Sequence, residues 1–144
     1  MDTLLRFSII DSVYQIVDRH QSLFHSFSNV YLFGSTVEGF THPGSDTDIG
    51  IIFSKGLPGK NRMKLYGDIY SVFNGIFRQK KLDLVFIEEL PLHIRFKAVT
   101  KGELLYTADL EASLNYKEYV INMYRDWKFF IDEFYQGLLE KDDQ

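Results

Sequence analysis

The chain of 144 residues contains no cysteine, only three prolines and a single tryptophan. The lack of cysteine excludes a disulfide framework and thiolate metal sites, and it is compatible with a reducing cytoplasm. No apolar run approaches the length of a membrane span, and the amino terminus lacks the charge and apolar pattern of a secretory signal. We therefore expect a cytoplasmic protein that does not associate with a membrane.

Positive charge is also scarce, because 16 Lys and Arg stand against 20 Asp and Glu, for a net charge of −4. No basic run is longer than Lys80-Lys81, so a nucleic-acid polymer is a poor candidate partner and a nucleotide or a protein is a better one. The four histidines lack the spacing of zinc ligands. Hydrophobic residues make up 45% of the chain, which predicts one domain over residues 1–144 with a sizeable core.

A glycine and two aspartates follow one another closely in the first third of the chain. Gly34-Ser35 comes after the apolar segment 29–33, so it is expected at the end of a strand, where backbone N–H groups and a hydroxyl can face an anion. Asp46 and Asp48 begin a second apolar segment that ends at residue 53. Residues two apart in a strand point to the same face, so we expect both carboxylates to point the same way.

A third carboxylate, Asp83, lies within the apolar segment 82–87. In a strand that looks buried, an ionised carboxylate is costly unless a cation or a donor compensates it. Convergence of Asp46, Asp48 and Asp83 would form an oxygen site of the kind that holds Mg²⁺ beside substrate phosphates. The competing interpretation is that residues 45–48 form only a solvated turn before a strand.

Hydrophobic periodicity predicts the remaining elements. Apolar residues at helical spacing indicate helices over residues 4–23, 62–77 and 91–100, and residues 104–106 are a strand candidate. A last helix is expected from about residue 114 to 139, with an apolar stripe formed by Tyr116, Val120, Met123, Tyr124, Trp127, Ile131, Phe134, Tyr135 and Leu138. Such a stripe is typical of a core, but further aromatic residues beside it favour a partner-binding surface as the alternative. The fold class is α/β (α+β), with a small mixed sheet flanked by helices.

The pattern Gly34-Ser35, Asp46, Asp48 and a later Asp83 resembles the signature of the DNA polymerase beta superfamily, and more narrowly that of its minimal nucleotidyltransferases. The resemblance runs over nearly the whole chain. It implies a polymerase-beta-like nucleotidyltransferase fold. It also implies that Asp46, Asp48 and Asp83 are catalytic and bind two Mg²⁺ ions, while Gly34 and Ser35 bind the phosphates of ATP.

Small proteins of this type are often antitoxins that transfer AMP from ATP to a tyrosine of an all-helical HEPN ribonuclease toxin. The resemblance therefore implies this activity and this partner for the chain, and a homodimer is compatible with it. Two alternatives stay open: a nucleotidyltransferase that modifies a small molecule of the aminoglycoside kind, and an inert antitoxin that acts by binding alone.

One residue departs from the family pattern, because Glu38 stands in the turn where many relatives carry a basic residue. Another cation would then have to compensate, from the partner or from one of the basic residues Lys55, Lys60, Arg62 and Lys64. Otherwise Glu38 points away from the triphosphate or catalysis is weakened. Arg19 and His25 also resemble the Arg-His signature of the HEPN toxins, but we reject the toxin assignment because the predicted strands do not fit an all-helical fold.

Overall fold

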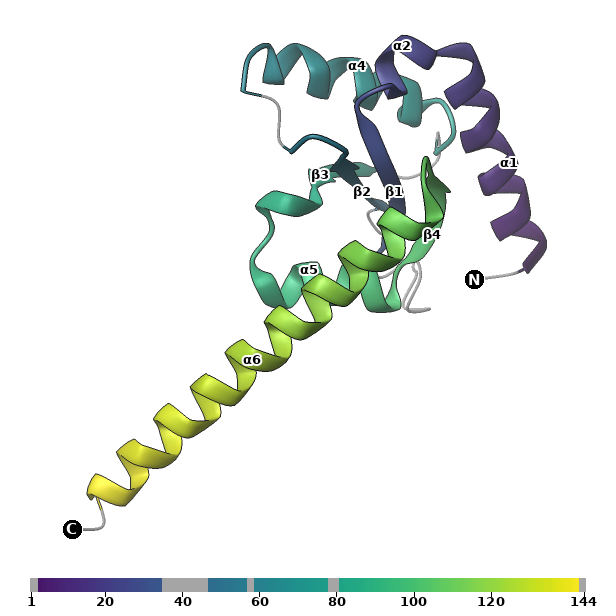
Figure 1. Cartoon of the computed structure of the whole chain (residues 1–144). Coiled ribbons are helices and arrows are strands. Elements are labelled where there is room, and N and C mark those ends of the chain that lie inside the picture. The colour runs from purple at the N-terminus through teal and green to yellow at the C-terminus, as the bar shows by residue number, and fades with distance from the viewer. Residues whose placement is uncertain (1–2, 35–46, 57–58, 78–80, 143–144) are drawn as a thin grey trace.

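The computed structural model describes residues 3–34, 47–56, 59–77 and 81–142 (Figure 1). Within these ranges a sheet of four strands is formed by β1 (Phe27–Phe33), β2 (Thr47–Phe53), β3 (Leu82–Phe86) and β4 (Glu103–Thr107). The helices are α1 (Thr3–Arg19), α2 (Gln21–Phe24), α4 (Arg62–Asn74), α5 (Leu92–Lys101) and α6 (Leu110–Asp142), with a short 3₁₀ helix η1 (Ile87–Glu89) after β3.

The sheet is mixed, with the strand order β3-β2-β1-β4. β1 pairs antiparallel with both β2 and β4, whereas β2 and β3 run parallel. The parallel pair needs a crossover, and α4 provides it between β2 and β3. The predicted α+β class with a small mixed sheet is confirmed, and the four strands contradict an all-helical toxin fold.

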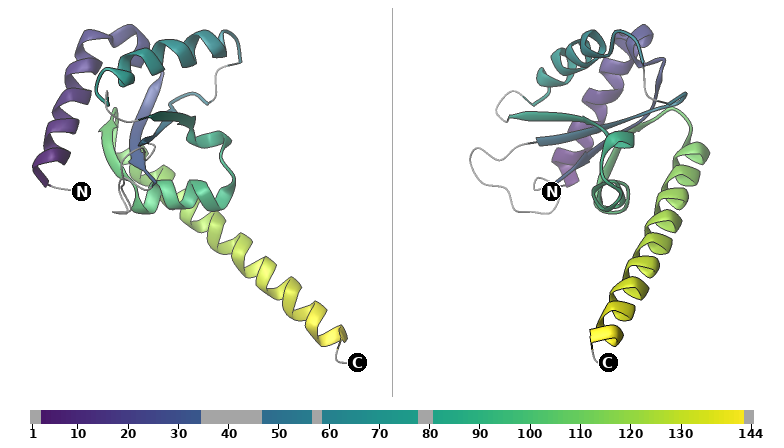
Figure 2. Two further views of the ribbon diagram at one scale, coloured as in Figure 1. Left: turned by 180° about the vertical axis from the view of Figure 1, so that it is seen from behind. Right: turned by 90° about the vertical axis from the view of Figure 1, so that its left-hand side faces the viewer.

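Helices α1, α2 and α4 cover one face of the sheet, and α5 and the first part of α6 cover the other (Figure 2). The first face holds the larger core, in which Val13, Phe24 and Phe73 from the helices pack on strand residues such as Leu32 and Ile51. Full burial of each such side chain stabilises the fold by about 1.5–3 kcal/mol before entropy is counted. This core fixes the strands relative to one another.

The second face holds a smaller core. Ala98 and Val99 of α5 and Val120 of α6 are buried there against Tyr31 and Ile52 of the sheet. The candidate site lies on this face, at one end of the strands.

Most predicted elements are confirmed with shifted ends. The first helix is interrupted at His20 and continues as α2, and the second predicted helix ends at Asn74 instead of residue 77. The strand candidate at 104–106 is β4. None of the helices within the described part of the chain has the length and apolar character needed to cross a membrane.

The last helix differs most from its prediction. It runs from Leu110 to Asp142, and its second half projects away from the rest of the molecule (Figures 1 and 2). Of the predicted apolar stripe only Val120 is fully buried, while Trp127, Phe134 and Leu138 are 44–55% exposed. The interpretation of the whole stripe as core is therefore wrong beyond about residue 124.

Candidate active site

Gly34 directly follows β1 and touches a carboxylate of the neighbouring strand. Its backbone has a φ of +84°, a conformation that L side chains rarely adopt. A Cβ at this position would stand 1.9 Å from Oδ2 of Asp48. Phe33, the residue before it, pairs with Asp48 in the antiparallel β1–β2 ladder. Glycine is therefore required here because the Asp48 carboxylate occupies the space of a side chain.

Asp48 and Asp83 lie side by side. They are register partners in the parallel β2–β3 ladder, so their Cα atoms are about 4.8 Å apart, the ordinary distance between neighbouring strands. Ile49 beside Asp48, and Leu82 and Leu84 on either side of Asp83, belong to the larger core, so both carboxylates point to the opposite face. The structure thus brings together two of the three carboxylates that the sequence singled out.

Asp83 is exposed, which corrects the expectation of a carboxylate within a buried strand. The strand alternates as expected, with Leu82, Leu84 and Phe86 buried, but β3 is the edge strand of the described sheet. Asp83 points to the face that α5 and α6 cover only partly. Solvent therefore reaches this carboxylate, so its ionised form does not have to be compensated by a cation for the fold to be stable.

Two of the predicted site residues, Ser35 and Asp46, lie outside the described residues, and so does Glu38. Within the described ranges no group of three or more His, Asp or Glu side chains is placed to hold a metal ion. The donors that are placed, two carboxylates on neighbouring strands beside a bare glycine, fit Mg²⁺, which takes oxygen ligands and is usually held by one or two carboxylates plus substrate phosphates. The carboxylate pair Asp48–Asp83 is the part of the site that can be described.

The negative charge of Asp83 acts on the hydroxyl group of Tyr66 in α4. Burial raises the pKa of the Tyr66 hydroxyl above its ordinary value, and the negative charges of Asp83 and of an ionised Tyr70 raise it further. A tyrosinate beside Asp83 is thus disfavoured at neutral pH, and Tyr66 remains a neutral hydrogen-bonding group.

The basic residues suggested as partners of the triphosphate do not cluster at this end of the sheet. Lys55 follows the carboxyl end of β2, whereas Asp48 lies at its start. Arg62 forms a salt bridge with Glu89, just beyond the carboxyl end of β3, and stacks at 5.2 Å over the ring of Phe86, the last residue of that strand. The suggestion is therefore wrong for Lys55 and Arg62, because the chain direction of β2 and β3 carries them away from the aspartates.

A different lysine lies at the correct end. Lys81 is exposed, it precedes β3, and its carbonyl oxygen accepts a 2.7 Å hydrogen bond from the backbone N–H of Thr47. This bond holds Lys81 next to the residue that precedes Asp48. The sequence signal for it was only the basic pair at residues 80 and 81, because the parallel pairing of β2 with β3 is a property of the fold.

A family model described as "Polymerase beta, Nucleotidyltransferase" matches residues 8–111, which is more than half of the chain. The chain therefore belongs to the polymerase beta nucleotidyltransferase family. The matched range includes Gly34, Asp48 and Asp83. It ends within the first turn of α6, so the projecting part of that helix lies outside the family match.

Solved structures share the fold. A chain in a crystal structure of a toxin-antitoxin with AMP-PNP is 19% identical with a TM-score of 0.64, over 90% of this chain and 98% of that one. A chain from a complex of the tri-AMPylated HEPN toxin of Shewanella oneidensis with its MNT antitoxin is 16% identical with a TM-score of 0.61, over 93% and 98% of the two chains. A chain in the MntA-HepT toxin-antitoxin structure is 17% identical with a TM-score of 0.59, over 91% of this chain and 97% of that one. A search of curated protein sequences gave no match.

Proposed function

We propose that this chain is a magnesium-dependent nucleotidyltransferase that transfers AMP from ATP to a hydroxyl group of a partner HEPN-type toxin, and so acts as the antitoxin. The acceptor that we expect is a tyrosine. The observation that carries the proposal is the in-register pair Asp48–Asp83 with the bare Gly34 against Asp48, in a member of the polymerase beta nucleotidyltransferase family. Structures of similar fold include a toxin-antitoxin with AMP-PNP and a complex with an AMPylated HEPN toxin.

Each predicted site residue has a proposed role. Asp46, Asp48 and Asp83 would hold two Mg²⁺ ions, which neutralise phosphate charge and lower the pKa of the acceptor hydroxyl. Gly34 and Ser35 would hold the outgoing pyrophosphate through backbone N–H groups and a hydroxyl.

The transfer itself forms a bond between the acceptor oxygen and the α-phosphorus and breaks the bond from that phosphorus to the bridging oxygen, so that pyrophosphate leaves. Asp83 is exposed and can accept the proton of a hydroxyl that approaches from solvent. Positioning and charge neutralisation supply most of the catalysis in phosphoryl transfer, so each of these residues is expected to matter.

The position of the carboxylate pair favours a macromolecular acceptor. Asp83 lies on an edge strand, and its side chain is open to solvent, so a tyrosine on the surface of another protein can reach it. This exposure supports a protein acceptor over the small-molecule alternative.

Intact-mass spectrometry tests the proposal. The protein is mixed with ATP, Mg²⁺ and the protein encoded beside it, with the Asp48→Asn variant as the inactive control and Asp68→Asn as a control for loss of a distant exposed carboxylate. We expect a mass gain of one or more AMP units on the partner with wild type and Asp68→Asn, and none with Asp48→Asn. A stable complex without any mass gain would instead assign the chain as an antitoxin that acts by binding alone.

A further inference from the structure

Lys81 enters the sheet beside the carboxylate pair. It directly precedes β3, and its carbonyl oxygen accepts a 2.7 Å hydrogen bond from the backbone N–H of Thr47 at the start of β2. This bond continues the parallel ladder that pairs Asp48 with Asp83. The backbone of Lys81 is therefore held in line with the two strands that carry the aspartates.

Alternation along β3 directs the Lys81 side chain to the face of the carboxylates. Leu82 is buried in the larger core, so its neighbours on both sides, Lys81 and Asp83, point to the opposite face. Residues two apart in a strand are separated by about 6.6–6.8 Å, which the flexible four-carbon stem of a lysine can span. Lys81 and Asp83 are both exposed. The Lys81 ammonium group can therefore reach a ligand that the carboxylates hold.

The carboxylate face at this end of the sheet needs positive charge to hold a nucleotide. Asp48 and Asp83 lie side by side there, and the phosphates of ATP are anionic as well, so mutual repulsion opposes binding. Within the described part of the chain Lys81 forms no salt bridge, so no described carboxylate neutralises its charge. A lysine ammonium in this position offsets part of the repulsion, because it binds phosphate as a point charge.

Arg6 and Lys101 also lie at this end of the sheet, but neither adjoins a strand that carries an aspartate. Arg6 forms a 3.5 Å salt bridge with Glu103 at the start of β4. Lys101 ends α5 two residues before β4, and β4 lies two strands from β2, a separation of about 9–10 Å. Of these three basic residues, Lys81 is the one that the strand register places beside the carboxylate pair.

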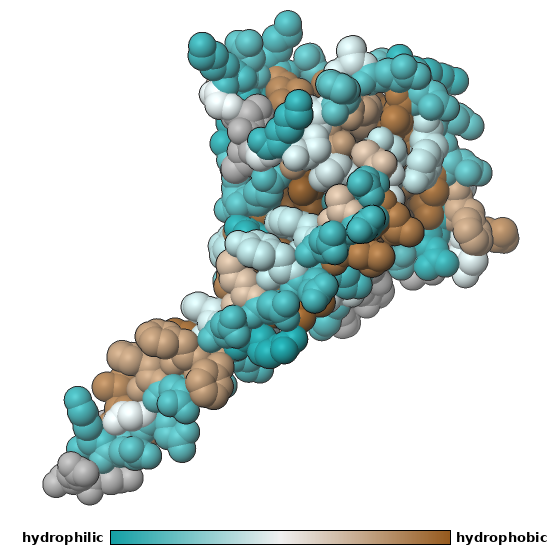
Figure 3. All heavy atoms as spheres, in the orientation of Figure 1, coloured by the Kyte–Doolittle hydropathy of each residue, from teal (hydrophilic) through white to brown (hydrophobic). Residues whose placement is uncertain are grey.

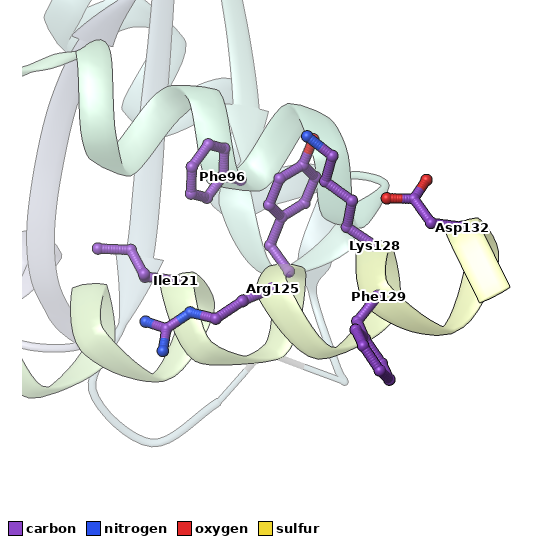
Figure 4. A pocket seen from close by; sticks show the side chains of 7 residues that line it. Phe96, Ile121, Arg125, Lys128, Phe129 and Asp132 are labelled. Carbon is purple, nitrogen blue, oxygen red and sulfur yellow. The ribbon is translucent and has the colours of Figure 1, made fainter.

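The basic residues of α6 belong to a different surface. Figure 3 shows apolar side chains gathered on the projecting part of this helix. Arg125, Lys128 and Asp132 line a hollow of about 410 Å³ between α5 and α6 (Figure 4). The Asp132 carboxylate opposes the binding of an anion there, and neither described aspartate of the site lines the hollow. The positive charge that serves the carboxylate pair is therefore sought at the sheet.

We propose that Lys81 is a substrate-binding residue whose ammonium group holds the α-phosphate of ATP. This inference rests on the proposed function, because it requires ATP at the carboxylate pair. Gly34, the proposed pyrophosphate contact, follows β1 on one side of Asp48, and Lys81 lies with β3 on the other side. The phosphate next to β3 is therefore the one that the acceptor hydroxyl attacks. An ammonium group at this position stabilises negative charge on its oxygens in the transition state.

Isothermal titration of Mn²⁺ alone, and of ATP at saturating Mn²⁺, tests the assignment. In Lys81→Ala the Kd of Mn²⁺ should stay unchanged or fall, because a positive charge beside the carboxylates is removed. The Kd of ATP should instead rise by at least about tenfold, the effect of losing one charge-assisted hydrogen bond. Lys81→Arg should restore most of the ATP affinity, since a guanidinium group also binds phosphate. A lysine that only supported the fold would weaken both ligands together.

Lys55→Ala is the matched control. Lys55 is an exposed lysine that follows the opposite end of β2, so its loss should leave the binding of Mn²⁺ and of ATP unchanged. At saturating ATP, AMP transfer should fall by at least about tenfold in Lys81→Ala and should be unchanged in Lys55→Ala, because only Lys81 contacts the reacting phosphate. Urea denaturation of the same preparations should give equal midpoints for the two variants.

Three outcomes would overturn the inference and leave the proposed function standing. The first is ATP binding by Lys81→Ala as tight as by wild type, with binding still lost in Asp83→Asn. The second is a parallel loss of Mn²⁺ and ATP binding in Lys81→Ala, which would show a structural role. The third is a loss of ATP binding in Lys101→Ala but not in Lys81→Ala, which would place the cation beside β4.

A different result would reach further. A wild-type chain that binds no ATP in the presence of Mn²⁺ would contradict the proposed function, and the assignment of Lys81 would fall with it.

Discussion

The face of the sheet under α1, α2 and α4 is lined by apolar side chains, whereas the face under α5 and α6 also carries Asp48, Asp83 and the buried Asn29. The strands are the same, so the difference arises from alternation: Ile49, Leu82 and Leu84, which directly neighbour the aspartates, point into the larger core. One face thus supplies rigidity and the other presents the chemistry. We expect mutations on the two faces to separate stability from activity.

The largest expected effect is on activity, at the carboxylate pair. Asp83→Asn should reduce AMP transfer by about a thousandfold or more, since one carboxylate that orients metal and acceptor is lost. Because Asp83 is exposed, the free energy of unfolding should change by no more than about 0.5 kcal/mol. Transfer rates and urea denaturation of the same preparations check both statements. Near-normal transfer would remove Asp83 from the site.

The opposite result is expected on the first face. Phe73→Ala should lower the free energy of unfolding by about 3–5 kcal/mol, because Phe73 is fully buried in the larger core. Transfer per folded molecule should remain near wild type. The matched control is Phe134→Ala on α6, where Phe134 is 55% exposed and the stability change should be small. Equal destabilisation by both variants would contradict the assignment of the core.

A pair of glycines separates backbone strain from the collision with Asp48. Gly34 and Gly56 both have positive φ, at +84° and +80°, but an added Cβ meets Asp48 only at Gly34 and meets nothing within 4 Å at Gly56. Gly56→Ala should cost only about 1–2 kcal/mol of left-handed strain. Gly34→Ala should cost more and should also reduce transfer by at least about tenfold, because the carboxylate must move. Thermal unfolding and AMP-transfer assays of both variants test this. Equal losses of stability and of transfer in the two variants would show that the contact between position 34 and Asp48 is unimportant.

The smallest expected effect is on alkaline stability. Burial raises the pKa of the Tyr116 hydroxyl to about 12, although the nearby Arg95 partly opposes this. Between about pH 10 and 12 the unfolded chain therefore loses this proton while the folded chain keeps it, so stability falls as pH rises. Tyr116→Phe should make that fall shallower without abolishing it, because burial also raises the pKa of Tyr31 and Tyr106. Urea unfolding at about pH 9 and about pH 11, on either side of the ordinary tyrosine pKa, measures the slope. An unchanged slope would contradict the raised pKa.

Much of the fold could be predicted because it depends on local periodicity. The alternation in β2 and the helical spacing in α4 and α5 are properties of the sequence itself. The environment of Asp83 could not be predicted, because apolar neighbours occur on central and edge strands alike. The position of Lys81 beside Thr47 depends on parallel pairing, which no local pattern contains.

The apolar stripe of α6 shows a different limit. Its periodicity correctly predicts a helix with one apolar face, but the same pattern is produced by a face that packs inside the chain and by one that packs on another chain. Val120 and Phe134 are equivalent in the pattern, yet one is fully buried and the other is exposed. The two residues differ only because α6 is longer than the part of it that packs on the sheet, so that Val120 lies against the domain and Phe134 lies beyond it.

Isothermal titration of Mn²⁺ and ATP into the protein is the most direct test of the carboxylate pair. We predict metal-dependent ATP binding by the wild-type chain and loss of most of that binding in both Asp48→Asn and Asp83→Asn, with Asp68→Asn unaffected. Metal-dependent ATP binding that is unchanged in both site variants would contradict the account, because the two carboxylates would then not form the nucleotide site.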